Sequence, residues 1–251
     1  FFTAFEVHAL NIALRAYISG HAPWSDAYES LVYISLISVL AGVLFFKHQS
    51  FALGAASLFA SVSLLVAHLN FINPQITNLV PVLKSFWLSV HVSVITASYG
   101  FLGFGFVLGL VGLILMALKN DKNEQKLSEQ IRYLAATDEL SLIIGLSLLT
   151  IGNFLGGVWA NESWGRYWGW DSKESWSYIT IIVYAIVLHL RFIPKLRGAF
   201  AFLTASVLSF ASVLFTYFGV NFYLSGLHSY ANGESFGVSG LIYLILAALA
   251  L

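Results

Sequence analysis

The sequence contains no cysteine, and both methionine and charged residues are scarce. Without cysteine the chain can form no disulfide, so any thiol that takes part in its chemistry must come from a partner. Charged residues make up 10% of the 251 residues and hydrophobic residues 59%, a balance that excludes an ordinary soluble protein and indicates a membrane protein. The formal net charge is zero, so nothing in the charge balance indicates a nucleic-acid partner.

Eight apolar runs follow one another along the chain. They cover roughly residues 1–18, 29–46, 51–69, 85–118, 139–158, 177–192, 198–218 and 237–251. A bilayer needs about 20 apolar residues of helix, so the fourth run is long enough to tilt or protrude and the last is short. We predict an all-α polytopic membrane protein with about eight transmembrane helices in a single domain, residues 1–251. Both ends of the sequence fall inside apolar runs, so we expect a fragment of a longer protein.

Two further features of the sequence predict details of the fold. The fourth run contains five glycines that should allow close contact with neighbouring helices: Gly100, Gly103, Gly105, Gly109 and Gly112. The one hydrophilic segment, residues 119–138, is predicted to be a cytoplasmic loop with room for a short surface helix.

The distribution of basic residues predicts the orientation in the membrane. Strict alternation of the eight runs places eight of the twelve lysines and arginines on one side, which the positive-inside rule makes cytoplasmic: Lys47, Lys119, Lys122, Lys126, Arg132, Arg191, Lys195 and Arg197. The loops 19–28, 70–84, 159–176 and 219–236 then share the external side.

An external stretch, residues 159–176, is exceptionally rich in aromatic residues. It contains five of the seven tryptophans and one tyrosine: Trp159, Trp164, Tyr167, Trp168, Trp170 and Trp176. Interfacial anchoring explains one or two tryptophans, and Asp171 with Glu174 three residues later is typical of a helix cap with a capping box. Five tryptophans with glycine spacers also suit a platform for a large planar ligand. Composition alone leaves anchor and platform open.

The histidines fall at different depths of the predicted topology. His91 and His228 lie at the level of the aromatic stretch, where two imidazoles facing each other would suit a bis-histidine haem. His189 and His8 lie within apolar runs, where an ionisable residue is a functional candidate. The remaining three, His21, His48 and His68, are expected to be interfacial or hydrogen-bonded residues.

The motifs resemble a known family of membrane haem-handling proteins. Trp164-Gly-Arg-Tyr-Trp-Gly-Trp-Asp171-Ser-Lys-Glu174 is similar to the tryptophan-rich WWD signature of cytochrome c maturation proteins. The segments Ser19–Ser25, Pro81–His91 and Val220–Tyr230 narrow the resemblance to the CcsA (ResC) family of system II cytochrome c synthetases.

The resemblance implies a function, ligands and partners. His91 and His228 would ligate a periplasmic haem b beside the WWD segment and act in catalysis, and His189 would ligate a second haem in the membrane with an axial partner from a CcsB (ResB) part. The activity implied is export of haem and its covalent attachment to apocytochrome c. The location implied is a bacterial inner membrane, or a thylakoid membrane if the protein is plastid-encoded.

The resemblance also implies a mechanism, and an alternative function stays open. The aromatic faces would hold the macrocycle, and both thiols of the apocytochrome Cys-x-x-Cys-His motif would come from the substrate, because this chain has none. Arg166 and Lys173 could face the haem propionates, or they could be solvated loop residues. The alternative function is a haem transporter or chaperone without ligase activity, although no inverted repeat supports a secondary transporter.

Overall fold

A computed structural model describes residues 1–47, 49–69, 72–76, 83–224 and 226. Most of these residues are helical, and none of them is in a strand. In order, the elements are α1 (Phe2–Ser19), α2 (Ala27–Phe45), α3 (Ala52–Ala67), α4 (Phe86–Ala117), α5 (Glu124–Trp164), α6 (Ser172–His189), the 3₁₀ turn η2 (Leu190–Phe192), α7 (Ala199–Leu214), the π-helical turn η3 (Phe215–Gly219) and α8 (Val220–Tyr223).

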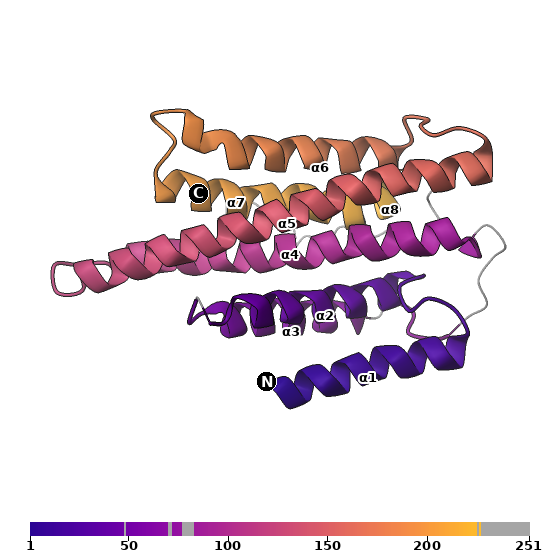
Figure 1. The fold of residues 1–251 in the computed structure, drawn as a ribbon, viewed down its shortest axis with the longest axis horizontal. Coiled ribbons are helices and arrows are strands. Elements are labelled where there is room, and N and C mark those ends of the chain that lie inside the picture. Colours follow the sequence, from indigo (N-terminus) through magenta and orange to yellow (C-terminus); the bar gives the residue numbers. More distant parts are fainter. Residues whose placement is uncertain (48, 70–71, 77–82, 225, 227–251) are drawn as a thin grey trace.

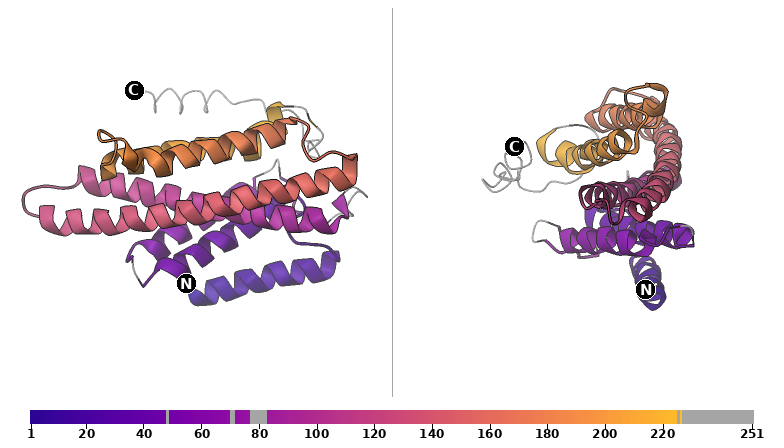
Figure 2. Two further views of the ribbon diagram at one scale, coloured as in Figure 1. Left: turned by 45° about the horizontal axis from the view of Figure 1, so that its top comes forward. Right: turned by 90° about the vertical axis from the view of Figure 1, so that its left-hand side faces the viewer.

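The helices run alternately in opposite directions, so their connections gather at two ends (Figures 1 and 2). The connections α1–α2, α3–α4 and α5–α6 lie at one end together with α8, and we call this the tryptophan end. The connections α2–α3, α4–α5 and α6–α7 lie at the other, which we call the basic end. This grouping agrees with the alternation predicted from the sequence, and a membrane between the two ends would separate their loops.

Five stretches of the described chain are long and apolar enough to cross a membrane: Ala27–Phe45, Phe86–Ala117, Glu124–Trp164, Ser172–Phe192 and Ala199–Tyr223. Helix α3 is apolar but shorter. The prediction of an all-α membrane protein is therefore confirmed. Residues 237–251, the last predicted run, lie outside the described residues, and the count of eight crossings stays a prediction.

Helix α5 is longer than the apolar run that predicted it. It has 41 residues and includes most of the hydrophilic segment 119–138, which is a loop only as far as Asn123. The residues from Glu124 to Asp138 include no glycine or proline and are mostly good helix formers, so the helix continues without a break. The predicted loop at 119–138 is thus mainly the first turns of α5.

Helix α4 lies at the centre of the bundle, and its glycines allow the neighbouring helices to approach it closely. A Cβ at Gly100 would lie 2.8 Å from Ile37 of α2, and a Cβ at Gly103 would enter the ring of Phe59 of α3. On other faces, Gly105 approaches α5 and Gly109 approaches α7. The prediction of close contacts at these glycines is confirmed, because the small residues admit neighbours on several sides of one helix.

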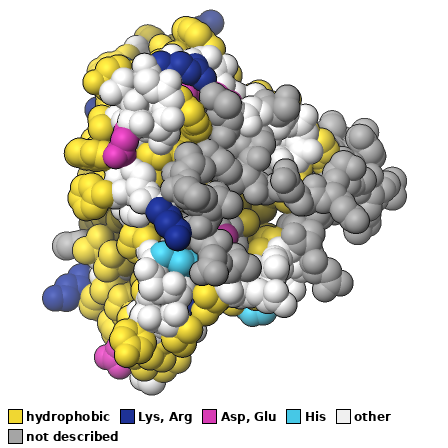
Figure 3. All heavy atoms as spheres, turned by 90° about the vertical axis from the view of Figure 1, so that its right-hand side faces the viewer, with side chains coloured by type: hydrophobic (Ala, Val, Ile, Leu, Met, Phe, Trp, Pro, Cys, Tyr) yellow, Lys and Arg dark blue, Asp and Glu magenta, His cyan; other side chains and the backbone are white. Residues whose placement is uncertain are grey.

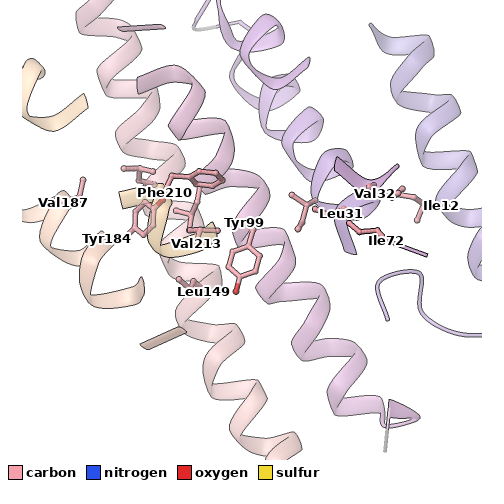
Figure 4. Close-up of a cluster of buried hydrophobic side chains, with 14 residues drawn as sticks. Ile12, Leu31, Val32, Ile72, Tyr99, Leu149, Tyr184, Val187, Phe210 and Val213 are labelled. Atoms are coloured by element: carbon pink, nitrogen blue, oxygen red, sulfur yellow. The ribbon is translucent and has the colours of Figure 1, made fainter. Parts of the chain in front are cut away.

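The core lies between α4 and the helices around it (Figure 4). Tyr99 of α4, Leu149 of α5, Tyr184 of α6 and Phe210 of α7 belong to one cluster of buried side chains. Helix α1 packs mainly on α2, at the edge of the bundle (Figure 1). Helices α4 to α7 therefore pack together around one buried cluster, and α5 and α6 carry the aromatic stretch.

Candidate functional site

The aromatic stretch is held between two helix ends rather than forming one long loop. Residues 159–164 are helical and complete α5, because no residue breaks the helix before Gly165, which ends it in the left-handed conformation at φ 71°. Helix α6 begins directly after Asp171. The prediction of an external loop over 159–176 is therefore too long, and only residues 165–171 connect the helices.

A capping box fixes the second half of this connection, as predicted from the sequence. The Asp171 carboxylate accepts the N–H of Lys173 at 2.9 Å, and the box is complete with Glu174 at the third helical position. Glu174 Oε2 also accepts the backbone N–H groups of Gly169 at 2.7 Å and of Asp171 at 3.1 Å. One carboxylate thus holds the backbone on both sides of Trp170.

The aromatic side chains divide into packed and exposed groups. Trp159 is fully buried and meets Trp164 edge to face at 4.8 Å between ring centroids. Trp176 lies on α6 and packs on Phe215 at 4.1 Å. These three tryptophans anchor the ends of the connection in the bundle, so they are not members of one open platform.

The exposed group consists of Tyr167 and Trp170, with 64% and 73% of their surfaces accessible. Trp168 packs edge to face on Trp170 at 5.6 Å and on Tyr178 at 6.3 Å. Trp170 is the one non-glycine residue of the described chain with positive φ, 56°, a conformation that L-residues adopt only where the surroundings impose it. The connection therefore presents Trp170 outward under constraint.

His91, in the second turn of α4, is fixed against α5 by a hydrogen bond and a glycine. Its Nδ1 donates to the carbonyl of Gly152 at 2.7 Å. A Cβ on Gly156 would lie 2.7 Å from Cε1 of the imidazole, so the ring rests on bare backbone. Trp159 lies nearly parallel to the ring, at 9° and 6.4 Å between centroids. With the proton on Nδ1, the neutral imidazole carries its lone pair on Nε2, the form that binds a metal.

The same turn of α5 also contacts the connection that carries the tryptophans. A Cβ on Gly157 would lie 3.0 Å from the carbonyl oxygen of Tyr167. The adjacent glycines Gly156 and Gly157 therefore let His91 and the backbone of Tyr167 pack on the same turn of α5. This contact brings the first predicted ligand close to the aromatic connection. Figure 3 looks onto this end of the molecule, where a few charged and histidine side chains lie among apolar ones.

Two basic residues of this region are held by the protein itself. Lys173 Nζ donates to the Asn221 side chain at 2.7 Å and to the Thr216 carbonyl at 3.2 Å, so Lys173 joins α6 to η3 and α8 and is not a solvated loop residue. The Arg166 guanidinium lies over Gly169, where a Cβ would come within 1.1 Å of Nη1. Arg166 therefore lies on the connection itself, between the tryptophans.

His228, the second predicted external ligand, lies outside the described residues. Gly226, two residues earlier, is described, and a Cβ there would lie 2.3 Å from Asp171 Oδ2. The described chain thus approaches the cap of α6 shortly before His228.

His189, the predicted membrane ligand, is the last residue of α6 and lies at the basic end. Its Nδ1 donates to the carbonyl of Ala185 at 2.7 Å, and its ring meets Phe192 at 5.7 Å. The side chain is exposed on the described part of the chain, although it lies within a predicted apolar run. The 18 residues of α6 separate it from Asp171, so His189 and His91 belong to different ends of the bundle.

The other described histidines bond to backbone carbonyls. His8 Nε2 bonds to the carbonyl of Val32 at 3.0 Å. His21 bonds to the carbonyl of Ala22, and His68 bonds to the carbonyl of Leu64. These contacts agree with a hydrogen-bonded role for His21 and His68, while His48 lies outside the described residues.

Sequence reasoning missed a buried carboxyl group, Asp138 of α5. Its side chain is fully buried beside Gly105, and Oδ1 accepts from Ser206 of α7 at 3.2 Å. Within the described residues Oδ2 has no hydrogen-bond partner. The signal was the position of Asp138 at the start of an apolar run, where a carboxyl group should have been counted with the histidines.

The residues at the tryptophan end fit a haem in their chemistry. His91 has the tautomer that a haem iron requires, and the buried indole N–H of Trp168 meets no acceptor on the described part of the chain. No group of three histidine, aspartate or glutamate side chains that could hold a metal ion occurs among the described residues. A haem iron, by contrast, needs only two axial ligands from the protein.

Comparison with known proteins gives consistent matches. The family described as "Cytochrome C assembly protein" matches residues 24–228. "Protein NrfI" of Wolinella succinogenes is 58% identical over 230 residues, which are 92% of this chain and 25% of that protein. "Cytochrome c biogenesis protein CcsA" of Prochlorococcus marinus is 35% identical over 260 residues (93% of this chain, 82% of that protein), and that of Chlamydomonas reinhardtii is 40% identical over 228 residues (88% and 64%). The chain thus spans about a quarter of the length of NrfI.

Proposed function

The chain belongs to the cytochrome c assembly protein family, as a CcsA-type cytochrome c biogenesis protein, and we propose that it exports haem and attaches it to apocytochrome c. The acceptor would be the Cys-x-x-Cys-His motif of the apocytochrome. The names of the relatives support the haem-handling part of this proposal. The ligase part rests on the residues at the tryptophan end.

One observation carries the proposal: a hydrogen bond and close packing fix the orientation of the His91 imidazole. The His91 ring rests on Gly156 and lies nearly parallel to Trp159, so its orientation is fixed by packing as well as by the hydrogen bond. The hydrogen bond from Nδ1 to the Gly152 carbonyl sets the tautomer that leaves the lone pair on Nε2. His91 would therefore ligate the iron of an external haem b, with His228 as the opposite ligand.

The aromatic connection would hold the plane of the porphyrin. Tyr167 and Trp170 offer exposed rings, and Trp168 offers an indole N–H for a propionate. Arg166 supplies a positive charge on the same connection. Three packed tryptophans would fix the connection to α5 and α6 without touching the haem: Trp159, Trp164 and Trp176. Asp171 would act as the helix cap.

The reaction needs no nucleophile from this chain. Each substrate cysteine adds its sulfur to one carbon of a haem vinyl group and its hydrogen to the other, so a C–S bond forms without net oxidation. The absence of cysteine keeps competing thiols away from the vinyl groups. The protein would position the two partners and control the iron ligands, and the substrate histidine would replace one of them.

Haem would reach this site from the basic end, with His189 as a ligand on the way. His189 also holds its proton on Nδ1, because that atom donates to the Ala185 carbonyl. Its exposure on this chain suits an iron whose other ligand comes from a CcsB-like part. We propose the tryptophan end as the external, periplasmic side of a bacterial inner membrane, or its thylakoid counterpart, on the strength of the basic-residue distribution.

The test is to express the protein with an apocytochrome c, with and without a CcsB-like protein, in a host that lacks cytochrome c assembly proteins. We expect His91→Gly to abolish covalent haem on the apocytochrome, and added imidazole to restore part of it by filling the vacant axial position. His68→Gly is the matched control, because that exposed histidine, like His91, bonds through Nδ1 to a backbone carbonyl, in its case that of Leu64. Wild-type attachment in His91→Gly would refute the ligand assignment.

The alternative function, haem transport or chaperoning without ligation, gives a different result in the same experiment. Purified protein would then show a bis-histidine haem spectrum while the apocytochrome carries no covalent haem. Covalent haem that depends on both His91 and the substrate cysteines would exclude this alternative.

A further inference from the structure

The basic end contains a cavity that the proposed catalytic site does not use. It has a volume of about 330 Å³ and lies between the start of α5, the end of α6 with η2, and the start of α7. Three arginines line it, each from a different element: Arg132 of α5, Arg191 of η2 and Arg197 just before α7. Its apolar lining includes Ile131, Leu188 and Phe202.

The charges around the cavity do not cancel. Arg191 donates to Glu139 at 2.6 Å, which neutralises one pair. Arg132 and Arg197 have no carboxylate within 4.0 Å on the described part of the chain, and Arg197 bonds only to the carbonyl of Pro194. Guanidinium groups prefer carboxylate or phosphate partners, so the arrangement of the cavity favours an anionic ligand.

The apolar stretches beside the cavity indicate the chemistry of the uncharged part of the ligand. The apolar stretch Ser172–Phe192 ends beside the cavity, and the stretch Ala199–Tyr223 begins there. Leu188 and Phe202 belong to these two apolar stretches, whereas Arg197 lies in the connection between them. Basic pockets between membrane helices on the positive side suit anionic amphiphiles.

We propose that this cavity binds an anionic amphiphile, with its carboxylate or phosphate between Arg132 and Arg197 and its apolar part along Leu188 and Phe202. Two sources have this chemistry, an anionic phospholipid and a porphyrin with propionate groups. The porphyrin alternative rests on the proposed function. It would place a site for loading haem next to His189, which directly follows Leu188 in α6.

The experiment measures binding of two probes to the purified full chain in phosphatidylcholine nanodiscs. One probe is a metal-free dicarboxylate porphyrin, followed by its fluorescence, so that iron ligation by histidine cannot contribute. The other is phosphatidylglycerol, counted as bound lipid by native mass spectrometry. The variant is Arg132→Gln with Arg197→Gln. The matched control is Lys122→Gln with Lys126→Gln, which removes two charges from the same end but outside the cavity.

We expect the arginine variant to bind at least one probe about tenfold more weakly, because it loses two charge-assisted contacts, and the lysine control to stay within about twofold of wild type. Loss of porphyrin binding alone would identify the porphyrin as ligand, and loss of phosphatidylglycerol alone would identify the lipid. Unchanged binding of both probes, or equal losses in the two variants, would overturn the proposal.

Two further measurements separate this proposal from folding and from the proposed function. Arg132→Lys with Arg197→Lys keeps both charges and should keep most of the binding, whereas a variant that merely fails to fold would not be rescued in this way. His91→Ala should bind both probes at this cavity as wild type does. Loss of covalent attachment in His91→Ala with normal probe binding would show that the two sites fail independently.

Discussion

Gly156→Ala should disable the site at His91 while leaving the fold largely intact. An added Cβ at position 156 would lie 2.7 Å from Cε1 and 2.9 Å from Nδ1 of His91, whereas carbon atoms in contact prefer about 3.5–4.0 Å. The ring must therefore retreat by about 1 Å. The Nδ1–Gly152 hydrogen bond, now 2.7 Å long, would then exceed the range of a hydrogen bond.

The effect on stability should be smaller than the effect on the ligand. Overpacking costs about 1–3 kcal/mol and the lost hydrogen bond about 1 kcal/mol, while alanine in a helix recovers about 0.5–1 kcal/mol relative to glycine. The free energy of unfolding should fall by roughly 1–3 kcal/mol. Loss of the group that orients a metal-binding histidine costs about 10–100-fold in metal affinity.

The assay compares haem per protein and melting temperature in Gly156→Ala and Gly54→Ala. Gly54 is the matched control, because it lies within α3 and an added Cβ there meets no atom within 4 Å. We expect Gly54→Ala to keep wild-type haem and Gly156→Ala to lose most of the haem ligated by His91. Wild-type haem content and spectrum in Gly156→Ala would refute the reasoning that the bare backbone positions the imidazole.

Three other predictions test separate parts of the structure. In intact cells, a single cysteine at Gln75, at the tryptophan end, should react with an impermeant thiol reagent and one at Asn123 should not; the reverse result would invert the proposed orientation. Glu174→Ala should lower the free energy of unfolding by about 1–2 kcal/mol and haem content further, because Trp170 loses its backbone support; unchanged haem content would contradict this role. Asp138→Asn should fold with wild-type stability within about 1 kcal/mol, since the amide keeps the shape of the carboxyl group and its oxygen can still accept from Ser206, whereas marked destabilisation in thermal unfolding would show that a charge is required there.

Most of the fold could be predicted from the sequence, because apolar length and helix caps are local properties. The run at 85–118 predicted α4 to within one residue at each end, and the capping box predicted the start of α6. The limits of α5 could not be found in this way. Its hydrophilic first turns and its last turn through Trp164 are helical because nothing between Glu124 and Gly165 stops the helix, and hydropathy does not report that.

The candidate site was less accessible to sequence reasoning, because it depends on which faces of two helices meet. The predicted topology placed His91 at the level of the tryptophans. The glycine beneath its ring, Gly156, lies in the run 139–158, where no feature of the sequence singled out a glycine. The tryptophans could not be sorted from sequence into buried Trp159 and exposed Trp170, since the same residue type performs both tasks. The exposure of His189 likewise depends on helix orientation and not on depth along the helix.

Three glycines lie where the aromatic connection and His91 meet the rest of the described chain. Gly156 lets His91 rest on α5 one residue from the contact between Gly157 and Tyr167. Gly226, two residues before His228, approaches Asp171 so closely that a Cβ there would lie 2.3 Å from Oδ2 of the carboxylate. Lys173 strengthens this second contact by binding Asn221 five residues earlier. The capping box therefore does more than start a helix, because its seven-residue connection contacts both the turn of α5 beneath His91 and Gly226.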